Sequence, residues 1–167
     1  TELRDIPERQ RSIRAVFASS WQRLSAAEQA VFMRLAVFRG GLTRAAADSV
    51  AQASLPILSR LVGGSLLRRD RGGRYQIHEL LRQYGQLRLE EAGAYVETPE
   101  KHAVYFMDFL RCCTPRLAGS GQSMTIHEIE ADFENIRTGW QWAVSACCYD
   151  LIDAALDGLF RWFWLRR

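Results

Sequence analysis

The stretch SLLRRDRGGRYQIHELLRQYG, from Ser65 to Gly85, combines two short runs of strand-forming residues with the start of a helix. We predict strands over residues 65–69 and 74–77, joined by a glycine-bearing turn as in a β-hairpin. After the second strand, leucines and a tyrosine recur at helical spacing, which predicts a helix over residues 79–91. His78 therefore lies where a strand ends and a helix begins.

Helices are also predicted before this hairpin. Ser25 and Glu28 form a capping box that begins one helix, and Thr43 is a suitable cap for another. Paired glycines end two of the helical patterns. The four predicted helices cover residues 7–24, 25–39, 44–51 and 54–63. Helices followed by a hairpin and a further helix form the element order of a winged helix.

The second half of the chain has helical periodicity. It begins after a break near residues 92–99, and its predicted helices cover residues 101–113, 123–147 and 150 onward. Such segments pack as antiparallel pairs, as in α-α repeat proteins with about 34 to 47 residues per unit. We therefore predict a mainly α fold with two domains, a winged helix over residues 1–95 and the first helices of an α-α superhelical repeat over residues 96–167.

The composition is that of a globular chain, with 167 residues, 48% hydrophobic and 25% charged. The 22 basic and 19 acidic residues are interspersed, so the net charge of +3 indicates neither a nucleic acid nor an anionic membrane as a partner. No apolar run approaches the roughly 20 residues that span a bilayer, and the charged start is unlike a signal peptide. We expect a cytoplasmic protein.

The sequence offers little support for a metal site or an enzyme. The four cysteines form two adjacent pairs, and we predict that they fill the core as reduced thiols: Cys112, Cys113, Cys147 and Cys148. His127-Glu128 begins like a zinc-protease motif, but Ala131 stands where the second histidine is needed. His102 is expected on the surface of its helix. A phosphate-binding loop and a catalytic triad are both absent from the sequence, so we expect no catalytic activity in this chain.

A winged helix raises the possibility of DNA binding. The recognition helix would cover residues 55–62, where only Ser59 and Arg60 could read base edges. The wing carries four arginines that could contact phosphates: Arg68, Arg69, Arg71 and Arg74. Phosphate contacts position a protein on DNA without reading its sequence, so we expect this winged helix to be used mainly for protein packing.

The two ends of the sequence lead us to expect a piece of a longer protein. It starts with Thr1 instead of methionine and stops just after the aromatic cluster FRWFWL. We expect this cluster either to self-associate, giving a homo-oligomer, or to pack on Trp140 and Trp142 of the preceding helix.

Three stretches resemble bacterial STAND signal-transduction ATPases, which are related to the NB-ARC proteins. IPERQRSIRAVFASSWQRLSAAEQAVFMRLAVFRGGLT (6–43) and LVGGSLLRRDRGGRYQIHELLRQYGQLRL (61–89) are similar to the winged-helix domain of that family. HEIEADFENIRTGWQWAVS (127–145) is similar to the helix that opens its tetratricopeptide-like superhelix. The resemblance implies an upstream nucleotide-binding domain that carries the P-loop, so that the parent protein would be an ATPase that binds ADP and ATP.

The resemblance also implies a role for His78, at the junction between the strand and the helix. Ile77-His78-Glu79 is similar to a hydrophobic-His-Asp motif whose histidine contacts the β-phosphate of ADP in the family. An imidazole N–H can donate to a phosphate oxygen, so the role is chemically reasonable. Glu79 replaces the aspartate of many relatives, which leaves the role of that acid open. The alternative is that His78 only caps and packs.

The implied function is regulatory. The winged helix would pack on the protein's own upstream nucleotide-binding domain and sense ADP through His78, while the helical region would bind an effector or partner protein. A transcription regulator that uses its winged helix to bind DNA is the alternative.

Overall fold

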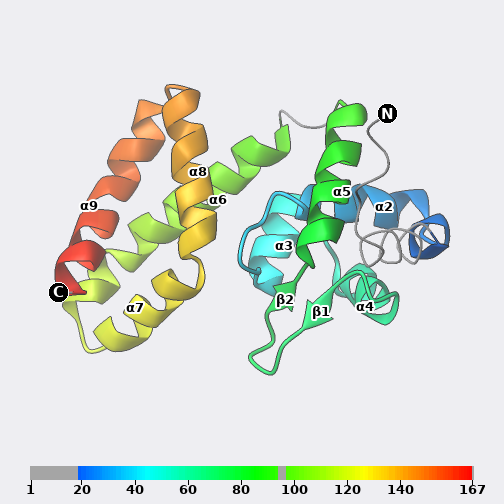
Figure 1. The fold of residues 1–167 in the computed structure, drawn as a ribbon. Helices are drawn as coiled ribbons and strands as arrows, with labels where there is room; N and C mark the ends of the chain where they lie inside the picture. The colour runs from blue at the N-terminus through cyan, green and yellow to red at the C-terminus, as the bar shows by residue number, and fades with distance from the viewer. Residues whose placement is uncertain (1–18, 94–96, 167) are drawn as a thin grey trace, which may run out of the picture. The chain divides into compact units, whose positions relative to one another are not determined.

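The computed structural model describes residues 19–93 and 97–166, and it is mainly helical with one short antiparallel hairpin (Figure 1). The predicted fold class is therefore confirmed. The chain divides into two compact units. In terms of the described residues, unit 1 comprises residues 19–37 and 43–93, and unit 2 comprises residues 38–42 and 97–166. The first predicted helix lies mostly outside the described residues.

Unit 1 has the predicted element order. Its elements are α2 (Ala26–Leu35), α3 (Arg44–Ala51), α4 (Leu55–Gly63), β1 (Arg68–Arg69), β2 (Tyr75–Gln76) and α5 (Glu79–Glu91). Helices, a hairpin and a final helix thus follow one another as in a winged helix. Five leucines and valines of this unit illustrate its apolar core, each at most 2% exposed: Val31, Leu35, Val50, Leu58 and Leu61.

Local capping explains where the first helices begin. Ser25 caps α2 through the predicted box, because its hydroxyl accepts from the Glu28 N–H and the Glu28 carboxylate accepts from the Ser25 N–H at 2.7 Å. The Thr43 hydroxyl accepts from the Ala46 N–H at 3.1 Å and caps α3. Both caps predicted from the sequence are confirmed.

The hairpin is shorter than predicted. Arg68 pairs with Gln76 and Arg69 with Tyr75, so each strand has two residues. The N–H groups of Leu66 and Leu67 instead donate to the Leu61 carbonyl, at 2.9 and 3.2 Å, and extend the end of α4. The predicted start of the first strand at residue 65 is therefore wrong, because these backbone groups bond locally and not across the hairpin.

Unit 2 is built from helices. They are α6 (Glu97–Cys113), the 3₁₀ helix η1 (Pro115–Ala118), α7 (Gln122–Ala131), α8 (Phe133–Ser145) and α9 (Tyr149–Leu165). α8 and α9 pack on α6 and on each other. None of the described helices of either unit is long and apolar enough to cross a membrane. The assignment of this unit to a tetratricopeptide-like repeat stays a prediction.

The single long helix predicted over residues 123–147 is wrong. The backbone leaves the helical conformation at Asp132, with φ of −109°, and α8 starts at the next residue. The Asp132 carboxylate accepts from the Asn135 side-chain amide at 3.1 Å. Hydrophobic spacing continues across this break because Ile129 and Ile136 both face the core, and the pattern alone therefore could not show it.

Trp162 is the last buried residue of α9 and belongs to the core of unit 2. It is fully buried and stacks on Phe133 of α8, with ring centroids 4.9 Å apart. The C-terminal aromatic cluster thus packs back on the preceding helix at this residue, through Phe133. The predicted packing on Trp140 and Trp142 stays a prediction.

The prediction that all four cysteines fill the core is wrong for two of them. Cys113 is buried, and burial raises the pKa of its thiol to about 11. Cys148 is half-buried, whereas Cys112 and Cys147 are exposed. Adjacent residues of a helix point about 100° apart, so α6 buries only one member of its pair.

Glycine allows α9 to approach α6 closely. A Cβ on Gly158 would lie 2.6 Å from the Leu110 carbonyl oxygen and 2.8 Å from the Thr114 hydroxyl. We predict that Gly158→Ala lowers the free energy of unfolding by about 1 to 3 kcal/mol, because the gain in helix propensity is smaller than the steric cost. Urea unfolding followed by circular dichroism measures this change.

The control for Gly158 is Gly63 in α4, where an added Cβ would meet nothing within 4 Å. Gly63→Ala should be neutral or stabilise by less than about 1 kcal/mol. Equal effects of the two substitutions would contradict the close approach of α9 to α6.

Candidate functional site

A groove of about 450 Å³ lies beside the hairpin of unit 1. It is lined by Val62, Ser65, Leu66, Leu67, Arg68, Arg69, Gln76, His78 and Leu81. Three of the site residues predicted from the sequence, His78, Arg68 and Arg69, therefore share one groove. Arg71 and Arg74 do not line it, since the first lies in the turn and the second just before β2.

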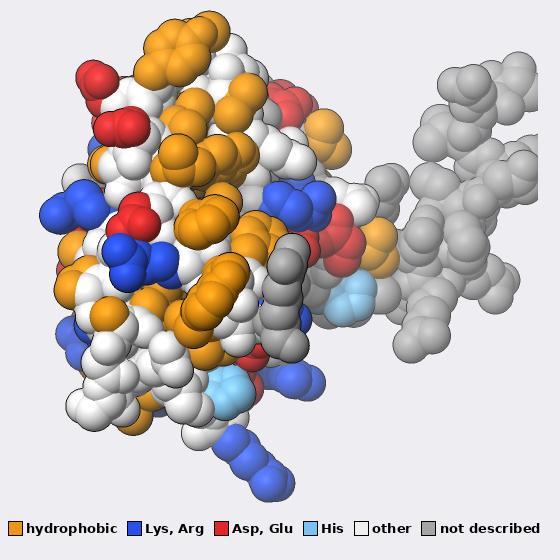
Figure 2. All heavy atoms as spheres, turned by 90° about the vertical axis from the view of Figure 1, so that its left-hand side faces the viewer, with side chains coloured by type: hydrophobic (Ala, Val, Ile, Leu, Met, Phe, Trp, Pro, Cys, Tyr) orange, Lys and Arg blue, Asp and Glu red, His pale blue; other side chains and the backbone are white. Residues whose placement is uncertain are grey.

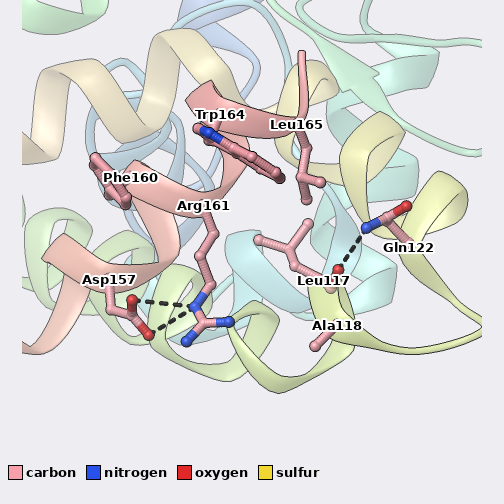
Figure 3. Close-up of a pocket in the computed structure, with 8 residues that line it drawn as sticks. All are labelled: Leu117, Ala118, Gln122, Asp157, Phe160, Arg161, Trp164 and Leu165. Atoms are coloured by element: carbon pink, nitrogen blue, oxygen red, sulfur yellow. Dashed lines mark hydrogen bonds and ion pairs between the residues drawn. The ribbon is translucent and has the colours of Figure 1, made fainter. Parts of the chain in front are cut away.

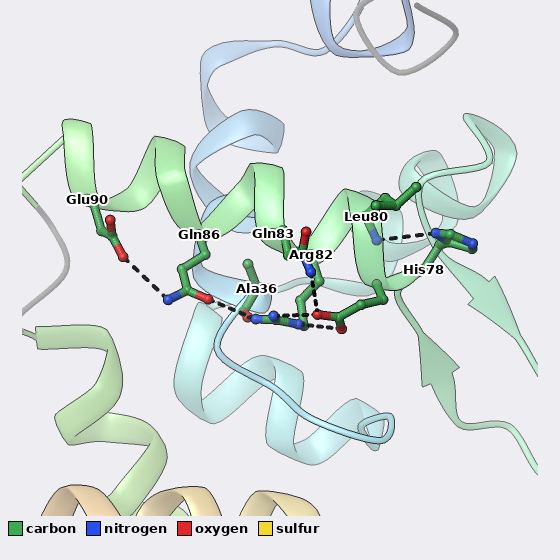
Figure 4. A network of polar contacts seen from close by, with 8 residues as sticks. Ala36, His78, Leu80, Arg82, Gln83, Gln86 and Glu90 are labelled. Atoms are coloured by element: carbon green, nitrogen blue, oxygen red, sulfur yellow. Dashed lines mark hydrogen bonds and ion pairs between the residues drawn. The ribbon is translucent and has the colours of Figure 1, made fainter. Parts of the chain in front are cut away.

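His78 is the N-cap of α5. Its backbone is extended, and its Nδ1 accepts from the Leu80 N–H at 3.3 Å (Figure 4). Because Nδ1 is the acceptor, a neutral ring in this arrangement carries its proton on Nε2. The side chain is exposed, so this second nitrogen is available as a donor to a ligand. Capping and ligand binding are therefore compatible at His78.

Glu79 holds a buried arginine. The Nε and Nη2 of Arg82 each donate to a Glu79 carboxylate oxygen at 2.8 Å, while Nη1 donates to the Ala36 carbonyl at 3.2 Å and to Gln86 at 2.9 Å (Figure 4). Arg82 is 6% exposed. These bonds connect the first turn of α5, directly after the cap residue His78, to the end of α2. The sequence left the role of Glu79 open, and it is structural here.

The wing presents its guanidinium groups outward. Arg68, Arg69 and Arg71 are exposed, and the Arg69 guanidinium lies 5.8 Å from the centre of the Tyr75 ring. Asp70 closes the turn, because its carboxylate accepts from the Arg74 N–H at 2.9 Å. A short, closed turn with outward arginines gives a compact positive surface next to His78.

Helix α4 has little that could read a base. Its exposed residues are Leu55, Pro56, Ser59, Arg60 and Gly63. The Nε of Arg60 donates to the Glu28 carboxylate at 3.0 Å. Hydrogen bonds from Ser25, followed by the one from Arg60, hold the pKa of Glu28 below its ordinary value, so the acceptor is charged at neutral pH. The one arginine of α4 thus bonds to α2 through its Nε, while its side chain remains 68% exposed.

A second polar cluster lies in unit 2, around His102. The sequence predicted this histidine on the helix surface, which is wrong, since it is 1% exposed. Its ring packs against Phe38 and Phe106, with centroids 5.1 and 4.7 Å away, and its Nε2 lies 3.4 Å from the Asn135 Oδ1. Burial lowers its pKa to about 4. His102 shares a helix face with Phe106, four residues on, and this spacing was the available signal.

Asn135 links this cluster to the segment after α2. Its Oδ1 accepts from the Arg39 N–H at 2.7 Å, and its Nδ2 donates to the Gly41 carbonyl at 2.8 Å. Asn135 is fully buried, so the cluster has a structural role. Within residues 19–93 and 97–166 no group of three histidine, cysteine or acidic side chains is arranged to hold a metal ion.

Three curated relatives are similar to this chain. They are provisionally named HTH-type transcriptional regulators, one from Mycobacterium bovis and two from strains of Mycobacterium tuberculosis. Each is 30% identical over 152 residues, a match that covers 84% of this chain and 17% of the relative. The chain thus spans about a sixth of the length of these relatives. No family model and no solved structure matches the chain.

Proposed function

We propose that this chain is a regulatory module of a transcription regulator, and that its winged-helix unit contacts phosphate without reading base sequence. The observation that carries the proposal is the exposed His78 ring, with Nδ1 engaged by Leu80, in the same groove as Arg68 and Arg69. The names of the mycobacterial relatives support the regulatory context. The module acts by binding and not by catalysis.

Phosphate suits this groove chemically. Phosphate oxygens accept hydrogen bonds, and both an imidazole N–H and a guanidinium are donors, the latter often in pairs. The exposed side chains of α4 that could donate to a base edge are Ser59 and Arg60, and Arg60 already bonds Glu28. In a longer regulator, base reading would therefore belong to another domain.

The phosphate that the groove contacts can belong to the backbone of DNA. The four arginines of the wing lie within seven residues of one hairpin, where guanidinium groups can contact the phosphates of a DNA backbone. Such binding is weak, insensitive to sequence and strongly dependent on salt. The relatives' names favour this source.

The phosphate can instead belong to ADP, as the resemblance to the STAND ATPases implies. In this version the winged-helix unit packs on a nucleotide-binding domain of the same protein, His78 donates to the ADP β-phosphate, and the helical unit binds an effector or partner protein. The observation that favours it is the exposed apolar start of α4, Leu55 at 44% exposure followed by Pro56, which suits a protein surface better than a DNA groove.

If the groove contacts DNA, the affinity for duplex DNA should depend on the charge of the wing. Fluorescence anisotropy with a random-sequence duplex should show weak binding that Arg68→Glu with Arg69→Glu reduces by roughly tenfold or more. His78→Ala should reduce it by about fivefold, the equivalent of one hydrogen bond of about 1 kcal/mol. Arg111→Glu with Arg137→Glu makes the same change in net charge on exposed residues of unit 2, and it should have a much smaller effect.

Two further measurements separate the sources. If the phosphate belongs to ADP, His78→Ala should speed ADP release from a protein that joins this chain to a P-loop domain, and duplex binding by the chain alone should be absent. A consensus selected from random DNA and lost on Arg60→Ala would show base reading and contradict the proposal. Absence of both duplex binding and an effect of His78 on ADP would remove phosphate as the ligand.

A further inference from the structure

Helix α9 carries a hydrophobic stripe on its outward side. The stripe consists of Tyr149, Leu156, Phe160, Phe163 and Trp164, which are 71, 50, 67, 52 and 66% exposed. Their spacing of seven, four, three and one residues places them on one side of the helix. Figure 2 views the molecule from the side of α9 and shows hydrophobic side chains gathered along this face.

The stripe is not part of the core of unit 2. The opposite side of α9 supplies Ala155, Gly158 and Trp162, which are buried against α6 and α8. Single exposed hydrophobic residues are ordinary on a protein surface, but five large ones along one helix are the mark of an interaction surface.

A groove runs beside the stripe. It has a volume of about 370 Å³, and its walls come from η1 and the start of α7 on one side and from α9 on the other. Phe160, Trp164 and Leu165 line it together with Leu117, and the ion pair between Asp157 and Arg161 lies at its other end (Figure 3). A side chain from a binding partner therefore has both an apolar wall and a polar edge to contact.

The charges along α9 are divided by position. Acidic residues lie from the start to the middle of α9, at Asp150, Asp153 and Asp157, and its basic residue, Arg161, lies nearer its end; Arg166 follows the helix and pairs with Glu130. The side chains of Asp157 and Arg161 are 58 and 48% exposed, so both remain accessible from solvent. The helix is therefore complementary to a second copy of itself that runs in the opposite direction.

We propose that α9 pairs with α9 of a second copy of this chain, antiparallel, about a two-fold axis near Gly158. In this arrangement the acidic part of one helix faces the part of the other that carries Arg161, whereas a parallel pair would place like charges together. Leu156 then packs opposite Phe160 of the second copy, and Arg161 lies near Asp157 of the second copy. The pairing does not depend on the proposed function.

The area is sufficient for a modest dimer. A helix of 17 residues is about 25 Å long. Covering five half-exposed large side chains on each copy removes on the order of 1,000 Å² of surface in total, which is at the lower end of specific interfaces. We therefore expect a dissociation constant in the micromolar range.

Sedimentation of the full chain over a wide range of concentrations tests the dimer. The wild type should shift from monomer to dimer, and Phe160→Glu with Trp164→Glu should weaken the association by roughly a hundredfold, two tenfold steps for two buried charges. The helical content should not change, because both side chains are exposed. Leu87→Glu replaces a side chain of unit 1 that is 57% exposed, and it should leave the dimer intact.

The direction of the helices is tested with charge reversals. Arg161→Asp leaves an acidic residue at both positions 157 and 161, and Asp157→Arg leaves a basic residue at both, so each variant alone should dimerise roughly tenfold more weakly. A mixture of the two variants should form a heterodimer as strongly as the wild type, which an effect confined to one helix cannot produce. A wild-type chain that stays monomeric, a dimer insensitive to the Phe160 and Trp164 exchanges, or a mixture that fails to associate would each overturn the proposal.

Discussion

Asn135→Leu should lower the free energy of unfolding of unit 2 by about 3 to 4 kcal/mol. The substitution keeps the size of the side chain but removes an acceptor for the Arg39 N–H and a donor to the Gly41 carbonyl. It also removes the polar neighbour of the buried His102 ring. Each buried group left without a hydrogen bond costs about 1 to 3 kcal/mol.

Urea unfolding followed by tryptophan fluorescence measures this loss. Of the five tryptophans in the sequence, the four at positions 140, 142, 162 and 164 belong to unit 2, so the signal follows mainly this unit. Gln141→Leu makes the same exchange of amide for leucine on the exposed side of α8 and should change stability by less than about 0.5 kcal/mol. Similar losses for the two variants would show that the Asn135 network contributes little.

Stability should fall steeply in acid because of His102. Its pKa in the folded protein is about 4, against an ordinary value of 6.5 in the unfolded chain. Between these values the unfolded chain binds a proton that the folded chain does not. The free energy of unfolding therefore falls as the pH drops from 6.5 to about 4, by roughly 3 kcal/mol in all. Above pH 6.5 the residue contributes no pH dependence.

The effect is isolated by comparing variants at pH 7 and pH 5. His102→Gln cannot bind the proton and should lose part of the acid sensitivity of the wild type, while His78→Gln, at an exposed position, should keep it. Other titrating groups contribute equally to all three proteins. If His102→Gln shows the same pH dependence as the wild type, the histidine is protonated in the folded state without penalty.

The parts of the fold that the sequence could predict are those set by local contacts. The caps at Ser25 and Thr43 depend on residues three positions away, and the start of α5 at Glu79 follows a change in periodicity. The errors at Asp132 and His102 have a different origin. Asp132 and His102 both contact the Asn135 side chain, which also bonds to a segment more than ninety residues earlier in the chain, with separations of 96 and 94 residues. No local pattern contains that contact.

The candidate site was predictable to a similar extent. His78, at the junction of strand and helix, and the arginines of the wing can be identified in the sequence. The structure places His78, Arg68 and Arg69 in one groove. Gln76 also lines this groove and was missed, because a glutamine in a short strand has no distinguishing pattern. The bond between Glu79 and Arg82 has the spacing of one helical turn and could have been found, but the burial of Arg82 against α2 could not.

The contacts of residues 38–42 also determine the order in which the protein can fold. This segment leaves the ribosome well before Asn135, since 96 residues separate Arg39 from its hydrogen-bond partner. The helices of unit 1 can form as soon as residue 93 is available. The connection between α2 and α3 next gains the contacts of Phe38 with α6, and it gains its hydrogen bonds to Asn135 only when α8 has been synthesised. Closing so long a loop is slow and entropically unfavourable. Completion of unit 2 is therefore expected to be the last and slowest step of folding, and in a chain released before α8 the connection between α2 and α3 would lack its hydrogen bonds to Asn135.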